Sequence, residues 1–156
     1  MNILIHLAGH VPSDRPAQDQ QPGYVVIVNA FVTNPDGEVL LVRAGGAADT
    51  WEMPGGRVAP GETLHQALQR VIHSQAGIAV AATGVTGVYQ HASLGTLTMV
   101  FRARARRVRP HPGGATQAAF HRLDAAGVER LIAEPQTRSR IMDAMRGISA
   151  VYEAVR

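Results

Sequence analysis

The sequence predicts an α/β fold, an α/β/α sandwich in which a mixed sheet lies between two helical layers. Three observations indicate this class. Two apolar stretches, 24–33 and 38–43, flank the turn Asn34–Gly37, which is the pattern of a β-hairpin. A Gly-Gly turn then leads into residues 63–75, whose apolar side chains recur at helical spacing. Further apolar strands and amphipathic helices follow toward the C-terminus.

The remaining elements follow from the same periodicities and from capping residues. Thr63 can cap the first helix and Gly77 can end it, while Asp124 is placed to cap the second. The dipeptide Glu134-Pro135 separates the second helix from a third. In order, we expect strands over 24–33, 38–43, 78–88, 97–105 and 118–123, and helices over 63–75, 124–133 and 137–155.

Length and composition favour one globular domain. The chain has 156 residues, of which 46% are hydrophobic and 17% charged. We expect residues 1–23 to form an N-terminal strand and linker, and residues 24–156 to form a single domain. Cysteine is absent, which excludes a disulfide framework and fits the cytoplasm, the location that we expect. Lysine is absent too, which excludes Schiff-base catalysis by lysine.

The predicted domain is organised around the stretch from Trp51 to Ile78. The segment Trp51–Gly56 resembles a strand that ends in a glycine turn, where a ligand can approach the main chain closely. The helix follows after a second turn at Pro60-Gly61. The spacing along this stretch resembles the Nudix box of the Nudix hydrolase superfamily, and its matching residues are Gly56, Glu62, Arg70 and Gly77.

The resemblance covers roughly residues 24–131 and implies a Nudix-like fold and a cation-dependent hydrolase, but the metal-binding residues are replaced. The family has an Arg-Glu pair and a Glu-Glu pair, whose three glutamates bind the divalent cations that activate water. Here the pairs are Arg70-Val71 and Ser74-Gln75, and positions 71, 74 and 75 share one helix face. Valine, serine and glutamine are not anionic, and the chain has no Asp or Glu from Thr63 to Leu123. We therefore expect a degenerate Nudix box, with no metal and no cofactor.

Candidate site residues lie around the Gly-Gly turn and at the ends of strands. Glu52 precedes the turn and His91 ends a strand, and both side-chain types suit proton transfer, so these are the catalytic candidates. The ligand-binding candidates are Arg43, Arg57, Ser74 and Gln75. For Gly56, Glu62, Arg70 and Gly77 we expect structural roles as turn, ion pair and helix end.

A row of arginines begins within the predicted strand 97–105 and continues beyond its end. Because successive side chains of a strand point to opposite faces, arginines two residues apart lie on the same face. We interpret this face as the solvated face of an exposed edge strand, and the alternative is an anion-binding surface. Aromatic residues are too sparse for a stacking platform, so we expect no nucleic acid partner. The arginines of this row are Arg102, Arg104, Arg106, Arg107 and Arg109.

Three hypotheses for function remain open. The first is metal-independent chemistry on a small anionic, phosphorylated molecule in the former cation cleft. The second is binding of such a molecule by a non-catalytic or regulatory domain. The third is the ordinary activity that the resemblance implies, cation-dependent cleavage of a nucleoside diphosphate linked to another group. No segment has the roughly 20 apolar residues that span a membrane, so we expect no membrane partner. The strand Met1–Leu7 would allow a homodimer by exchange.

Overall fold

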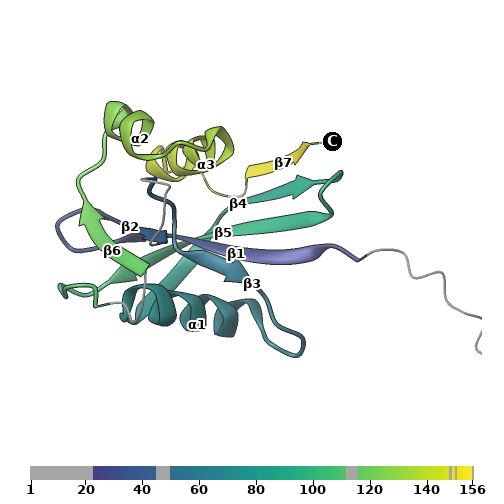
Figure 1. The fold of residues 1–156 in the computed structure, drawn as a ribbon, viewed down its shortest axis with the longest axis horizontal. Coiled ribbons are helices and arrows are strands. Elements are labelled where there is room, and N and C mark those ends of the chain that lie inside the picture. The colour runs from purple at the N-terminus through teal and green to yellow at the C-terminus, as the bar shows by residue number, and fades with distance from the viewer. Residues whose placement is uncertain (1–22, 45–49, 112–115, 148, 150, 156) are drawn as a thin grey trace, which may run out of the picture.

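The computed structural model describes residues 23–44, 50–111, 116–147, 149 and 151–155. A mixed sheet lies between helix α1 on one face and helices α2 and α3 on the other (Figure 1). The expected α/β/α sandwich is therefore confirmed. In chain order the elements are β1 (Val25–Thr33), β2 (Val39–Ala44), β3 (Gly55–Arg57), α1 (Leu64–Ala76), β4 (Val80–His91), β5 (Thr96–Ala105), β6 (Thr116–His121), α2 (Ala125–Leu131), α3 (Pro135–Met145) and β7 (Val151–Val155).

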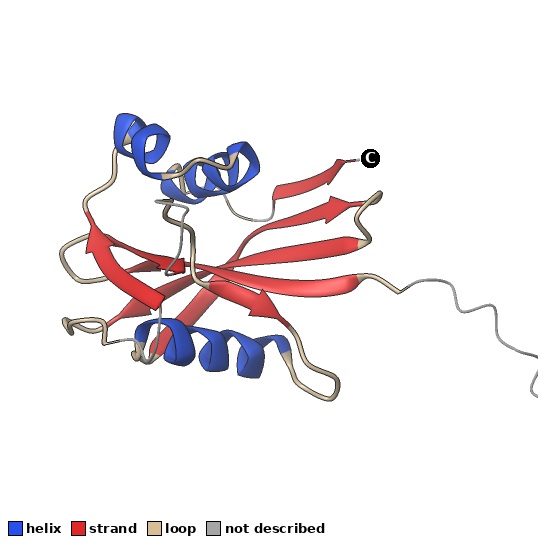
Figure 2. Cartoon of the chain, viewed as in Figure 1, coloured by secondary structure: helices blue, strands red, loops and turns tan. Residues whose placement is uncertain are grey.

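Strand β1 runs through the middle of the sheet and positions the two glycines that begin β3. The strand order is β6-β2-β1-β5-β4-β7, with β3 pairing with β1 outside this path. The pairs β1–β5 and β4–β7 are parallel and the other pairs are antiparallel, so the sheet is mixed (Figure 2). The expected turn at Gly55 and Gly56 is wrong: both glycines belong to β3 and pair with β1 at Val28 and Asn29, so this Gly-Gly segment lies directly beside the central strand.

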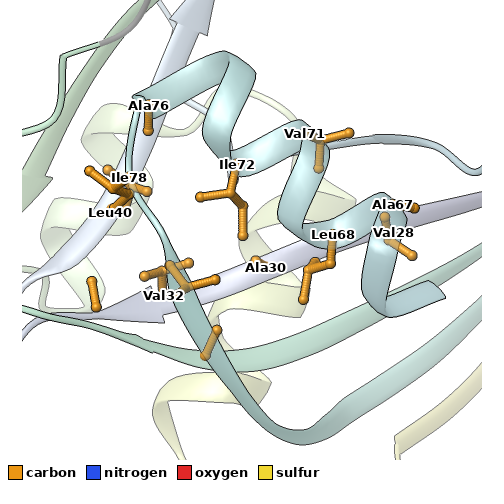
Figure 3. Close-up of a cluster of buried hydrophobic side chains, with 13 residues drawn as sticks. Val28, Ala30, Val32, Leu40, Ala67, Leu68, Val71, Ile72, Ala76 and Ile78 are labelled. Atoms are coloured by element: carbon orange, nitrogen blue, oxygen red, sulfur yellow. The ribbon is translucent and has the colours of Figure 1, made fainter. Parts of the chain in front are cut away.

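Helix α1 buries one apolar stripe against the sheet. Its residues Ala67, Leu68 and Ile72 are fully buried and pack against β1 (Figure 3). A second cluster fills the opposite face, where Phe31 and Val100 lie beneath α2 and α3. Burial on both faces explains why β1 has almost no polar side chains. No described helix is long and apolar enough to cross a membrane.

The expected C-terminal helix over 137–155 is wrong. Helix α3 already ends at Met145, and the following Gly147 has a φ of 74°, a left-handed conformation that stops a helix. Residues 151–155 instead form β7, which pairs in parallel with β4. The β-branched and aromatic residues of VYEAV favour a strand, and pairing with β4 outweighed the helical periodicity.

The expectation that strand 97–105 is an edge strand is also wrong. Strand β5 is hydrogen-bonded on both sides, to β1 and to β4, and therefore lies inside the sheet. The predicted N-terminal strand Met1–Leu7 and the linker after it lie outside the described residues, so the homodimer that this strand would allow stays a prediction.

Candidate functional site

The Gly-Gly segment at the start of β3 is held to helix α1 by the side-chain amide of Gln75. The backbone N–H of Gly55 donates to Oε1 of Gln75 at 3.0 Å, and Nε2 of Gln75 donates to the Gly55 carbonyl at 2.9 Å. A Cβ at Gly55 would lie 2.5 Å from the Val28 carbonyl oxygen, so only glycine allows this close approach to β1. The amide of Gln75 therefore links the last turn of α1 to the start of β3.

The residues on this face of α1 do not fit a divalent cation. Val71 is 5% exposed and belongs to the core cluster beneath α1, where it also packs against Gly56. Ser74 is exposed and neutral, and the amide of Gln75 is already hydrogen-bonded to the main chain. Hard cations require several oxygen ligands, preferably carboxylates. Among the described residues, no group of three or more His, Cys, Asp or Glu could hold a metal ion.

Glu62 and Arg70 form the ion pair that the box spacing predicts. Nε of Arg70 lies 2.7 Å from Oε1 of Glu62, and Nη2 lies 2.9 Å from Oε2. The same Nη2 donates to the carbonyl of Arg57, and Glu62 accepts the backbone N–H of Ala59. The hydrogen bond from Arg70 lowers the pKa of Glu62 to about 2. This pair fixes the loop between β3 and α1.

A capping box begins helix α1. The hydroxyl of Thr63 accepts the backbone N–H of Gln66 at 3.1 Å, and the Gln66 side chain accepts the backbone N–H of Thr63 at 2.8 Å. Thr63 was predicted as the cap, whereas its partner Gln66 was missed. The spacing Thr-x-x-Gln is the signal that predicts it. Gly77, with a φ of 67°, ends the helix as expected.

Arg43 belongs to a second polar cluster at the end of β2. Its Nε donates to Oε1 of Gln117 at 2.6 Å, and its guanidinium lies 5.0 Å from the ring centroid of Trp51. The ring of His121 packs edge-on against Trp51 at 4.5 Å. Burial lowers the pKa of His121, an effect that the charge of Glu38 opposes. The structure thus brings together Arg43, the amide of Gln117 and the ring of Trp51. Of these three residues, the sequence analysis named only Arg43 as a ligand-binding candidate.

The two catalytic candidates lie far apart. The exposed Glu52 follows Trp51, and a β-bridge pairs it with Val42, so its side chain lies on the face of the sheet opposite to that of Arg43. His91 ends β4, level with Val25 at the start of β1, and its Nδ1 is 3.2 Å from the hydroxyl of Ser93. Because Glu52 lies near the opposite end of β1, more than about 15 Å separates the two residues. They cannot act on the same atom.

These features define a domain of the Nudix class: a central strand flanked by a short Gly-Gly strand, an ion-paired loop and a helix closed by glycine. The family model described as the NUDIX domain matches residues 23–143. Since this match covers most of the chain, the protein belongs to the Nudix family.

Similar proteins agree with this assignment. A MutT-like protein from Streptomyces ambofaciens is 34% identical over 53% of this chain and 53% of its own length. A putative 8-oxo-dGTP diphosphatase from Bacillus subtilis is 39% identical over 38% of this chain and 40% of its own length. The matches thus span about half the length of these relatives or less. The crystal structure of a NUDIX hydrolase from Nitrosomonas europaea has a TM-score of 0.68 at 21% identity, covering 86% of this chain and 79% of its own, which shows the shared fold.

Proposed function

We propose that this Nudix protein is divergent: it does not use the box helix to bind a catalytic cation, and its cleft serves metal-independent chemistry on, or binding of, a small anionic, phosphorylated molecule. One observation carries the proposal. The side chain of Gln75, where the family has a glutamate, forms both of its hydrogen bonds with Gly55. The amide N–H of Gln75 thus already donates to the Gly55 carbonyl.

The neighbouring residues suggest how an anion would be held. Arg43 is partly exposed at the end of β2, and Arg57 is exposed at the end of β3. Guanidinium groups bind phosphate oxygens through paired, charge-assisted hydrogen bonds. Glu52 is the acid–base candidate on the other face of this part of the sheet, because it pairs with Val42 and not with Arg43. His91 is a separate candidate, because it cannot reach a ligand held near Glu52.

A hydrolysis assay across nucleoside diphosphate-linked substrates tests the proposal. We expect no turnover that depends on Mg²⁺ or Mn²⁺ and no effect of EDTA. We expect binding of phosphorylated ligands, measured by calorimetry, to weaken in Arg43→Gln. The exposed Arg122→Gln removes the same charge from the link between β6 and α2 and should bind normally. Brisk, EDTA-sensitive hydrolysis would overturn the proposal.

The second candidate is the ordinary activity of the family, cation-dependent hydrolysis of a nucleoside diphosphate linked to another group. The names of the relatives favour it, since one is a putative 8-oxo-dGTP diphosphatase and another an RNA pyrophosphohydrolase. This activity would need carboxylates from outside α1. Turnover that requires Mg²⁺ and survives replacement of Gln75 by alanine would support the second candidate over the first.

A further inference from the structure

The arginines within β5 and directly after it have different environments. Nη2 of Arg102 donates to the Ala144 carbonyl at 2.7 Å, and its guanidinium lies 5.6 Å from the ring centroid of Phe31. Arg107 forms an ion pair with Asp36 at 2.7 Å. These two side chains therefore have structural partners. The others in the row are exposed: Arg104, Arg106 and Arg109.

Arg104 lies between two hollows at one end of the sheet. Its neighbours in register are Thr33 in β1 and Ala81 in β4, both too small to cover a guanidinium. On one side, a hollow of about 390 Å³ extends from Arg104 to the turn between β1 and β2. On the other, a hollow of about 520 Å³ is lined by Arg104, Arg106 and the start of β4. Two arginines thus line the second hollow.

Acidic side chains are absent from the described residues that line these hollows, and those in the adjacent turn are bonded to other residues. Within the described part of the chain, none of the residues that line the two hollows is acidic. In the adjacent turn, Asp36 is paired with Arg107, and Glu38 accepts a hydrogen bond from Nδ2 of Asn34 at 2.8 Å. An anion that enters the hollow would therefore meet net positive charge.

We propose that Arg104 and Arg106 bind a small anion with two or more linked phosphate groups, at a site separate from the Gly-Gly segment of β3. Residues two apart along an extended chain are roughly 7 Å apart, so each guanidinium can bind a different phosphate of one oligophosphate. A single phosphate would engage one arginine and bind more weakly. The site does not depend on the proposed function, since none of its lining residues belongs to the Gly-Gly segment or to α1.

Titration calorimetry with inorganic triphosphate at physiological salt tests the site. We expect the double variant Arg104→Gln/Arg106→Gln to weaken triphosphate binding at least about tenfold. The control Arg122→Gln/Arg130→Gln removes the same charge from exposed positions elsewhere and should bind like the wild type. We also expect orthophosphate to bind wild-type protein more weakly than triphosphate does.

Four outcomes would overturn the inference. The wild type could fail to bind triphosphate, the control could lose as much affinity as the double variant, or orthophosphate could bind as tightly as triphosphate. Loss of triphosphate binding in Arg43→Gln, with normal binding in the double variant, would place the anion at the second polar cluster. That result would contradict this inference while supporting the proposed function, so the two can fail separately.

Discussion

The guanidinium of Arg70 and the carboxylate of Glu62 pair through two hydrogen bonds, at 2.7 and 2.9 Å. Arg70 projects from α1, while Glu62 lies in the loop that precedes it, so the pair closes the loop onto the helix. Because Arg70 also donates to the Arg57 carbonyl, the end of β3 is fixed by the same side chain. The box residues that remain in this sequence thus hold the architecture of this loop.

Acid should remove the contribution of Glu62 to stability. Its pKa is lowered to about 2 from 4.5, so the stabilisation is complete above about pH 4.5 and is lost as the pH falls toward 2. The melting temperature of Glu62→Gln should lie below that of the wild type at pH 7, and the difference should shrink between pH 4.5 and 2. For Glu129→Gln, at an exposed position of α2, we expect the difference in melting temperature from the wild type not to shrink over this pH range. A constant gap for Glu62→Gln would contradict the role of the ion pair.

Replacement of Gln75 by glutamate should destabilise the protein in a pH-dependent way. The introduced carboxylate would face the Gly55 carbonyl without a proton between them, at a cost of about 1–3 kcal/mol near neutral pH. Protonation would restore a donor, so the deficit should shrink as the pH falls from 7 toward roughly 4. Ser74→Glu adds the same charge at an exposed position of the same helical turn and should cost less. Urea denaturation at pH 7 and pH 4 measures both, and equal costs at pH 7 would count against the Gln75–Gly55 link.

Restoring the three carboxylates should create a cation site. The triple variant Val71→Glu/Ser74→Glu/Gln75→Glu places three anionic side chains on one face of α1. We expect Mn²⁺ to raise its melting temperature, because the cation binds the folded state and relieves the repulsion. The variant Val71→Gln/Ser74→Gln has side chains of similar length without charge and should not respond. If wild type and triple variant respond equally to Mn²⁺, the replaced positions are not what determines cation binding.

Gly77 should tolerate no side chain. Its φ is 67°, and an added Cβ would lie 2.4 Å from the carbonyl oxygen of His111. Gly77→Ala should therefore cost more than about 1 kcal/mol in the free energy of unfolding. In β4, a Cβ at Gly84 would meet nothing within 4 Å, so Gly84→Ala is the matched control, with a change below about 0.5 kcal/mol. Similar losses for both variants would show that the left-handed cap is not required.

The periodic and capped parts of the fold were predictable from the sequence. Thr63, Gly77 and Asp124 act locally, so their roles can be read from spacing, and each caps or ends a helix as expected. Residues 151–155 could not be assigned in this way. Their strand depends on pairing with β4, which is distant in sequence, and an amphipathic pattern alone does not reveal that contact.

The candidate site was predictable in its composition and less so in its contacts. The box spacing identified Gln75 as a replaced glutamate, but its partner Gly55 follows from the three-dimensional approach of α1 to β3. Likewise, the separation of Glu52 from His91 depends on the strand order, which the sequence did not determine. Contacts across a sheet are set by register, so a list of chemically suitable residues overestimates how many share one site.

Titration of the wild-type protein with Mn²⁺, followed by NMR, tests the central claim most directly. A bound paramagnetic ion broadens nearby amide signals, so Gly55 and Gln75 would report a cation on the box helix. With neutral side chains at positions 71, 74 and 75, their signals should broaden no more than that of the exposed Glu129 at millimolar Mn²⁺. Saturable, selective loss of the Gly55 and Gln75 signals would contradict the claim and favour the ordinary cation-dependent hydrolase.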